Sequence, residues 1–370
     1  MGAVLEPMSS KVPGLRSSRG QASDVTTARK AVLFVGAFPG PAALDRYVSG
    51  DLALRLQSLG WRTRVTSRRL RRLTRLWDIM IEIWRARGEY EVACIDVFSG
   101  PAFLWAEVAA WSLRRLNKPY VLILHGGSLP EFAARWPGRV RRLLASANIV
   151  TAPSGYLEQR MAHYRPEIRV IPNPIDISLY PYRERSPARP KLIWLRAFHE
   201  MYNPVMAVKV VAALSSKYPD IHLTMVGPDK GDGSLQRTKA EVVKAGLVEK
   251  VRFSGPVQKN EVPRVLAEAD IFLNTTNVDN TPVSVIEAMA CGLCVITTRV
   301  GGTPFLVSDG RDGLLVECGD VKAMAEGVAR LLEDEHLARR LSQTARQKAN
   351  DWNWPRMLAD WDRLLSRVRN

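Results

Sequence analysis

Short apolar runs alternate with amphipathic stretches along most of the chain. The first set of runs, typical of strands buried on both faces, covers residues 31–36, 92–97, 120–124, 148–152 and 169–171. Between them, apolar positions recur at helical spacing, for example over residues 51–59, which Gly60 ends, and over residues 139–147. Alternating strands and helices predict an α/β domain with a parallel sheet covered by helices.

The alternation starts again after the polar stretch 183–190. The second set of candidate strands is 191–195, 221–226, 251–253, 270–273, 294–297 and 314–316. The last stretch, 353–368, places Trp354, Trp361 and Leu365 among apolar residues at near-helical spacing and predicts a packing helix. We therefore expect a disordered leader (1–29), two Rossmann-like domains (30–185 and 186–350) and a C-terminal packing helix (351–370).

Length and composition agree with this division. A chain of 370 residues suits two domains, and with 46% hydrophobic residues but no apolar run long enough to span a membrane it is typical of soluble globular proteins. The four cysteines are too few and too unevenly spread for a disulfide framework, which favours a reducing, cytoplasmic compartment. The pair Cys291 and Cys294 lacks the further ligands of a zinc site, so we expect buried packing there.

Charge is distributed unevenly. The net charge is +16, and residues 1–185 hold 28 basic and 15 acidic residues, which gives +13 and leaves +3 for the rest. This asymmetry indicates that the first half meets an anionic partner. Nucleic acid is disfavoured because no recognised nucleic-acid module is present.

The most informative segment is 270–292, which is predicted as strand, polar loop and helix. In open α/β sheets, ligands bind at such strand ends, and free N–H groups of the first helical turn can hold a phosphate. Pro282 suits that first turn. A carboxylate one turn later, Glu287, can accept two hydrogen bonds from a diol. The candidate donor-binding residues here are Thr281, Pro282, Val283, Ser284, Val285 and Glu287.

This segment resembles glycosyltransferase family 4, whose members are retaining enzymes with the GT-B fold. Asp279 and Glu287 have that family's separation of seven intervening residues and are followed by Ala-Met-Ala and Gly292. The resemblance covers roughly residues 30–360 and implies two Rossmann-like domains with parallel sheets facing a central cleft. It also implies that Glu287 holds the ribose of a nucleotide sugar and that Asp279 lies near the transferred sugar. No metal ion or other cofactor is implied.

Further residues take roles from the same resemblance. Arg196, after strand 191–195, would clamp the donor diphosphate, but Met201 and Tyr202 stand where the family has a second cation, a lysine. His125 would face the donor sugar, and Gly40 belongs to a loose match to the family's first Gly-rich loop. We therefore predict His125, Asp279 and Arg196 as catalytic residues.

Two family-like glycines have two explanations. Gly301 and Gly302 either bring the chain close to the donor or form a purely structural turn. Phe305 stands shortly after them where the family commonly has Glu.

A basic amphipathic stretch spans residues 68–87. Leu70, Leu73, Trp77, Met80 and Trp84 recur there at helical spacing beside Arg68, Arg69, Arg71, Arg72 and Arg75. Such a helix either lies on an anionic membrane surface or packs its apolar stripe on the first domain. The sequence leaves both interpretations open.

The predicted function is transfer of a hexose from a nucleotide diphosphate sugar to a sugar or lipid-linked acceptor in cell-envelope or exopolysaccharide synthesis. The expected location is the cytoplasm, with peripheral contact to the inner face of the membrane as an option. Two alternatives are a sugar-nucleotide epimerase of the same architecture and a catalytically silent partner of another transferase. The missing lysine and Phe305 are the features that raise the silent-partner alternative.

Overall fold

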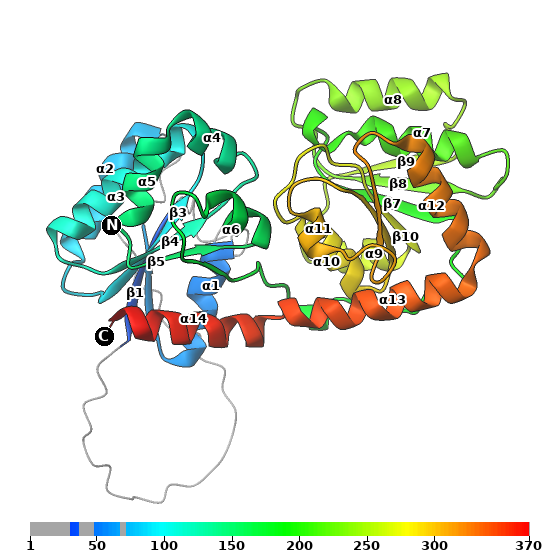
Figure 1. Ribbon diagram of the computed structural model, residues 1–370. Coiled ribbons are helices and arrows are strands. Elements are labelled where there is room, and N and C mark those ends of the chain that lie inside the picture. Colours follow the sequence, from blue (N-terminus) through cyan, green and yellow to red (C-terminus); the bar gives the residue numbers. More distant parts are fainter. Residues whose placement is uncertain (1–29, 37–47, 67–71, 370) are drawn as a thin grey trace, which may run out of the picture.

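The computed structural model describes residues 30–36, 48–66 and 72–369. They form two α/β domains, each built on a six-stranded parallel sheet with helices on its faces (Figure 1). The predicted leader 1–29, Gly40, and Arg68, Arg69, Leu70 and Arg71 lie outside the described residues.

The first sheet has the order β2-β1-β3-β4-β5-β6. Its strands are β1 (Ala31–Val35), β2 (Arg62–Val65), β3 (Val92–Val97), β4 (Tyr120–Leu124), β5 (Ile149–Ala152) and β6 (Ile168–Val170). The helices of this domain are α1 (Val48–Leu56), α2 (Arg72–Arg85), α3 (Phe103–Arg115), α4 (Leu129–Arg135), α5 (Pro137–Ala145) and α6 (Gly155–Met161). The sequence did not predict β2, because this edge strand reads Arg-Thr-Arg-Val and has no continuous apolar run.

The second sheet has the order β12-β11-β10-β7-β8-β9. Its strands are β7 (Lys191–Leu195), β8 (His222–Val226), β9 (Val251–Gly255), β10 (Ile271–Asn274), β11 (Cys294–Thr298) and β12 (Leu314–Val316). The helices are α7 (Pro204–Leu214), α8 (Ser234–Lys244), α9 (Val262–Ala267), α10 (Val283–Ala290), α11 (Thr303–Leu306), α12 (Val321–Glu333) and α13 (Glu335–Ala349).

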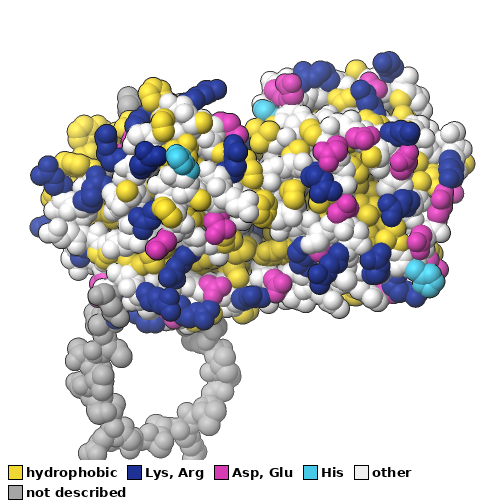
Figure 2. All heavy atoms as spheres, in the orientation of Figure 1, with side chains coloured by type: hydrophobic (Ala, Val, Ile, Leu, Met, Phe, Trp, Pro, Cys, Tyr) yellow, Lys and Arg dark blue, Asp and Glu magenta, His cyan; other side chains and the backbone are white. Residues whose placement is uncertain are grey.

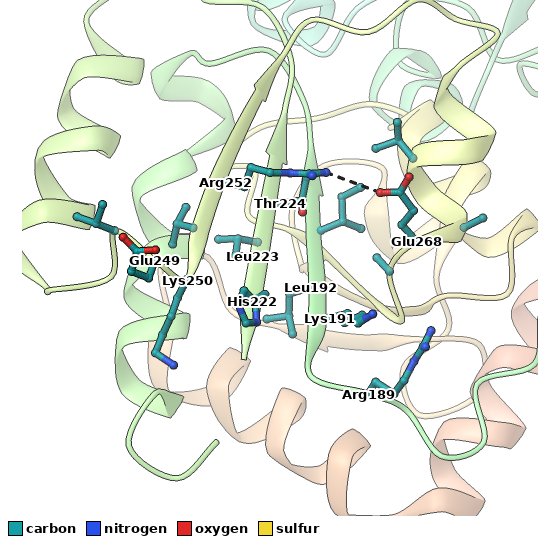
Figure 3. A pocket seen from close by; sticks show the side chains of 16 residues that line it. Arg189, Lys191, Leu192, His222, Leu223, Thr224, Glu249, Lys250, Arg252 and Glu268 are labelled. Atoms are coloured by element: carbon teal, nitrogen blue, oxygen red, sulfur yellow. Dashed lines mark ion pairs between the residues drawn. The ribbon is translucent and has the colours of Figure 1, made fainter. Parts of the chain in front are cut away.

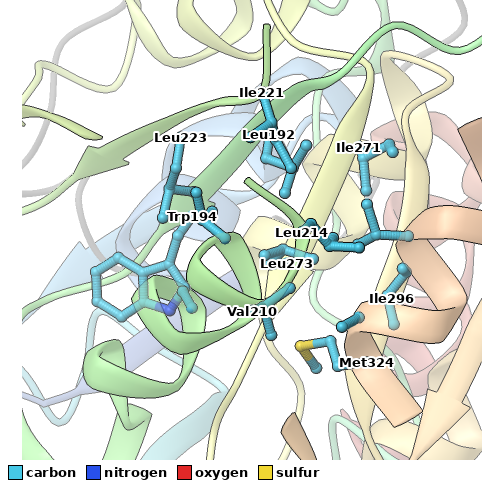
Figure 4. Packing of buried hydrophobic residues seen from close by; sticks show 14 of the residues in the cluster. Leu192, Trp194, Val210, Leu214, Ile221, Leu223, Ile271, Leu273, Ile296 and Met324 are labelled. Carbon is cyan, nitrogen blue, oxygen red and sulfur yellow. The ribbon is translucent and has the colours of Figure 1, made fainter. Parts of the chain in front are cut away.

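Both faces of the second sheet carry a hydrophobic core. On one face, side chains of β7, β8, β10 and β11 pack against α7 and α12, with Trp194, Val210 and Met324 among them (Figure 4). On the other face, α9, α10 and the end of α13 cover the strands. These two layers fix the carboxyl ends of β7 and β10, from which the candidate site is built.

The chain crosses between the domains twice. Ile175 and Tyr180 pack into the core of the second domain, so that core begins before residue 186. After α13 the chain returns, and α14 (Trp354–Arg369) packs on the first domain (Figure 1). There the Trp61 indole donates a hydrogen bond of 2.7 Å to Asp362. The helix predicted at the C-terminus is thus a structural part of the first domain.

None of the helices in the described ranges combines the length and apolarity needed to cross a bilayer.

Candidate functional site: a cleft between the two domains

The topological switch point of the second sheet lies between β7 and β10, where ligands of open α/β sheets bind. Arg196 follows β7, and the loop after β10 carries Asp279 and leads into α10. The Arg196 guanidinium donates to the Asp279 carboxylate, and the side chains are 17% and 11% exposed. The structure therefore brings together two of the three residues that the sequence predicted as catalytic.

A close approach of two backbones shapes the Asp279 loop. A Cβ atom on Gly301 would lie 1.9 Å from the Asp279 carbonyl oxygen, and one on Gly302 would lie 1.5 Å from the Asn280 carbonyl oxygen. The Gly302 N–H also donates to the Asp279 carbonyl oxygen at 3.0 Å. The glycine pair thus packs against the loop that presents Asp279, which gives it a structural role.

A cavity of about 420 Å³, which we call the strand-end cavity, opens at these loops. Its polar lining comes from Arg196, Tyr202, Lys230, Ser284 and Glu287, and its apolar lining includes Pro228, Val257, Val262 and Val283. The Arg196 guanidinium stacks on the Tyr202 ring, 4.2 Å from its centroid. An aromatic face therefore stands where the resemblance implies a lysine.

Glu287 is a buried carboxylate with one protein partner. It is 8% exposed, and the Tyr180 hydroxyl donates a hydrogen bond of 2.7 Å to its Oε1. Burial raises the pKa of Glu287 to about 6, against the opposing effect of the Tyr180 hydrogen bond. Its second oxygen remains available to accept hydrogen bonds.

Polar atoms of residues that line this cavity, and one of the neighbouring Thr281, which lines a second cavity, are buried without a hydrogen-bond partner among the described residues. They are Thr281 Oγ1, Ser284 Oγ and Arg196 Nε. Leaving such groups unpaired costs roughly 1–3 kcal/mol each. Because the first N–H groups of a helix also lack intrahelical partners, the N–H groups of Val283 and Ser284 at the start of α10 add to these donors. This pattern is typical of a site that is completed by a ligand.

Two neighbouring predictions differ from the structure in detail. Pro282 is the residue before α10 and not part of its first turn, since the helix begins at Val283. Val285 does not reach the cavity: its side chain is fully buried in the core, and its N–H donates to the Pro282 carbonyl oxygen at 3.0 Å.

The first domain closes the cleft from the opposite side. A second cavity of about 220 Å³, the interdomain cavity, is lined by His125, Gly127 and Asn173 together with Asp279 and Thr281. Tyr202 lines both cavities. The predicted site residues of the two domains therefore meet in one cleft.

His125 is held by a carboxylate that the sequence analysis did not single out. Its Nε2 lies 2.8 Å from Asp96 Oδ1, and the Ser49 hydroxyl donates to the same oxygen at 2.5 Å. The Phe98 ring stacks on the imidazole at a centroid distance of 4.7 Å. A carboxylate inside the apolar run 92–97 was the one sequence signal for Asp96.

A larger cavity of about 610 Å³ lies at the opposite, amino ends of β7, β8 and β9 (Figure 3). Both of its arginines are already engaged, since Arg189 pairs with Asp270 and Arg252 lies 3.7 Å from Glu268. We therefore place the candidate site at the cleft, where unsatisfied groups gather.

Among the described residues, no cluster of three His, Cys, Asp or Glu side chains is arranged to hold a metal ion.

Comparison with known families identifies the class of protein. The model of the family described as Glycosyltransferase Family 4 matches residues 31–179, and that described as Glycosyl transferases group 1 matches residues 183–348. Between them the two matches cover both domains. The chain belongs to the glycosyltransferases of the family 4 type, with the GT-B fold that the sequence predicted.

Individual relatives share less than a third of their residues with this chain. A D-inositol 3-phosphate glycosyltransferase of an Arthrobacter species is 26% identical over 270 residues, covering 69% of this chain and 64% of the relative. A GDP-mannose-dependent phosphatidylinositol monomannoside mannosyltransferase of Mycolicibacterium smegmatis is 29% identical over 248 residues, covering 61% and 64%. The alignments thus span just under two thirds of these relatives.

Solved structures agree on the fold. HepE of Anabaena, in complex with UDP and glucose, has a TM-score of 0.73 at 18% identity and is matched over 91% of this chain and 100% of its own. Sucrose-phosphate synthase of Thermosynechococcus elongatus has a TM-score of 0.76 at 19% identity, over 92% and 99%.

Proposed function

We propose that the protein transfers a hexose from a nucleotide diphosphate sugar, with retention of anomeric configuration, to a sugar or lipid-linked acceptor in cell-envelope or exopolysaccharide synthesis. The observation that carries the proposal is the set of buried atoms, of Arg196 after β7 and of Thr281 and Ser284 around the start of α10, that have no hydrogen-bond partner among the described residues. A donor diphosphate supplies the acceptor oxygens that these groups lack. The names of the relatives, which include phosphorylated and lipid-linked inositol, support the acceptor class.

We propose that each section of the cleft receives a different part of the donor. The diphosphate lies between Arg196 and the first N–H groups of α10, and the ribose hydroxyls donate to Glu287. The sugar then extends into the interdomain cavity, toward Asp279 and His125. Because Arg196 is paired with Asp279 in the structure, the incoming diphosphate has to share or replace that contact.

The proposed catalysis is stabilisation of the charges that develop as the donor bond breaks. As the bond between the anomeric carbon and the diphosphate breaks, negative charge grows on the leaving phosphate, where Arg196 and the N–H groups stabilise it. Positive character grows on the sugar, near the Asp279 carboxylate. A fixed guanidinium can serve the leaving group without a metal ion, so we expect turnover to survive chelation.

A panel of uridine, guanosine and adenosine diphosphate sugars tests the proposal. We expect one of them to raise the melting temperature, because a donor at about 100 times its dissociation constant stabilises the fold by about 2.7 kcal/mol. With that donor and candidate acceptors, NMR of the product reports the anomeric configuration, in EDTA and in magnesium. Stabilisation by no member of the panel, or an inverted product, contradicts the proposal.

The proposal includes a cytoplasmic enzyme held at the inner face of a membrane through the outer side of α2 and α3. Trp77, Ile81 and Trp84 on α2 are exposed, as are Leu104 and Trp111 on α3. Arginines accompany them, because Arg75 stacks over Trp105 and Arg115 over Trp111. Figure 2 shows hydrophobic side chains beside Lys and Arg over this end of the first domain. Exposed aromatic residues among cations favour an anionic interface.

A further inference from the structure

The strand-end cavity contains two cations of different status. Arg196 is engaged, because its guanidinium binds the Asp279 carboxylate and covers the Tyr202 ring. Burial also lowers the pKa of Arg196 below its ordinary value. Lys230 lines the same cavity, and its ammonium group has no hydrogen bond or ion pair with the described residues. The cavity therefore holds one cation that is available in full to a ligand.

Backbone hydrogen bonds fix the position from which the Lys230 side chain extends. It lies in the loop after β8, and its N–H donates to the Phe198 carbonyl oxygen at 3.1 Å, while the Phe198 N–H donates to the Pro228 carbonyl oxygen at 2.8 Å. In the same loop, a Cβ atom on Gly227 would lie 1.8 Å from the Arg196 carbonyl oxygen. The Lys230 loop is thus attached directly to the loop that carries Arg196, while the lysine side chain itself is exposed.

The charge of the expected ligand exceeds what Arg196 offers. The diphosphate of a nucleotide sugar carries two negative charges, and Asp279 already neutralises part of the Arg196 charge. The position where the resemblance implies a second cation holds Tyr202, whose ring faces Arg196. A charge-assisted hydrogen bond from an ammonium group to phosphate is roughly twice as strong as a neutral one, which favours a phosphate over a base or a sugar as its partner.

We propose that Lys230 is the second cationic residue of the diphosphate subsite, supplied from the loop after β8 in place of a lysine near residue 202. The inference rests on the proposed function, since it concerns the donor of that reaction. It makes Lys230 a determinant of selectivity for nucleoside diphosphates over nucleosides.

The test compares Lys230→Met with Lys230→Arg and with Lys244→Met, which removes an exposed lysine of α8 outside the cavity. Calorimetry measures the affinity of each protein for UDP and GDP, and ligand-detected NMR measures its affinity for uridine and guanosine. We expect Lys230→Met to weaken diphosphate binding about tenfold or more, because the lost bond corresponds to roughly 1.5–3 kcal/mol. Nucleoside affinity should stay within about twofold, and both Lys230→Arg and Lys244→Met should bind like the parent.

Three results overturn the inference. One is unchanged diphosphate affinity in Lys230→Met at an unchanged melting temperature. Another is an equal loss for nucleosides, which would place Lys230 at the base or the ribose. The third is a loss in Lys230→Arg as large as in Lys230→Met, which would mean that charge is not what matters. If the parent itself binds no nucleoside diphosphate, the proposed function fails instead.

Discussion

The two acidic residues of the site have different surroundings. Glu287 is buried and receives a hydrogen bond from Tyr180, whereas Asp279 is paired with Arg196 and faces the interdomain cavity. A buried carboxylate with one free oxygen suits a neutral diol. A carboxylate beside the expected sugar suits developing positive charge. Substitutions at these two positions should therefore affect binding and turnover differently.

Donor affinity should depend on pH through Glu287. Its raised pKa of about 6 means that the carboxylate protonates as the pH falls from 7.5 to 5 and loses capacity to accept the ribose hydroxyls. An intact nucleotide sugar has a diphosphate diester that does not titrate in this range, so calorimetry with it isolates the protein group. We expect affinity to fall through pH 6 in the parent, and to be weaker and nearly flat in Glu287→Gln. An unchanged pH profile in the variant would assign the transition to another group.

The same shift predicts a stability effect of defined sign. A carboxyl whose pKa is higher in the folded than in the unfolded chain binds its proton more tightly when folded. Ionised Glu287 therefore costs stability above about pH 6, and this cost disappears as the pH falls below the ordinary value of 4.5. Chemical unfolding of the parent and of Glu287→Gln should differ in their slope with pH between these two values.

Asp279→Asn should separate catalysis from binding. The variant keeps the shape of the side chain, but it removes the negative charge both from the sugar and from Arg196. Turnover with the full donor should fall about tenfold or more, corresponding to at least 1.4 kcal/mol of lost transition-state stabilisation. Affinity for the free diphosphate should hold or improve, because Arg196 is released. Kinetics measures the turnover and calorimetry measures the diphosphate affinity. Equal losses in turnover and in affinity would mean that Asp279 contributes to donor binding alone.

Local sequence patterns identified some site residues and not others. Asp279 and Glu287 are close in the chain, so their spacing alone placed them in one strand–loop–helix unit. Tyr180 and Glu287 are 107 positions apart, and Asp96 and His125 are 29 apart. Nothing local marks these partners, because the fold alone brings them together.

At the scale of elements, continuous apolar runs predicted the buried strands, and hydrophobic periodicity predicted α2. The periodicity did not identify which face of α2 is buried. Ile79 and Ile83 pack inward, while Trp77 and Trp84 of the predicted stripe face outward. A helix with two apolar stripes has two possible buried faces, and packing against the neighbouring elements selects one.

The turn before α11 should tolerate no side chain. Gly302→Ala places a methyl group against the Asn280 carbonyl oxygen, and overpacking of this kind costs roughly 1–3 kcal/mol or more. We expect a lower melting temperature and weaker donor binding, because the displaced loop carries Asp279 and leads into α10. Gly138→Ala is the control, since a methyl group there meets nothing within 4 Å. Equal melting temperatures for the two variants would contradict the packing argument.

At the scale of the whole molecule, the cleft depends on contacts between the domains. The Ser154 hydroxyl donates to the Asn280 side-chain oxygen, and the Phe305 ring packs where a side chain on Gly155 would otherwise lie. Both contacts lie beside the loop of Asp279. Phe305, which departs from the family pattern, thus contributes an apolar contact between the two domains. Closure of the cleft and assembly of the site are consequently coupled.

The outer face of α2 carries the last prediction, which concerns the orientation of the whole enzyme. We expect the protein to sediment with vesicles containing anionic lipid, to bind neutral vesicles weakly, and to dissociate as salt is raised, because cations on this face are screened. The double variant Trp77→Ser, Trp84→Ser should lose about tenfold or more in partitioning, since the two side chains are 65% and 38% exposed and their removal leaves the core intact.

The matched control is Val243→Ser, Val248→Ser, which removes two apolar side chains, 68% and 59% exposed, from the second domain. This control should bind vesicles like the parent, and all three proteins should melt at similar temperatures, so that a loss reports the surface and not the fold. If the tryptophan variant sediments as well as the parent, α2 does not face the membrane. Any vesicle binding that remained would then have to come from the basic charge of the first domain and not from the exposed tryptophans.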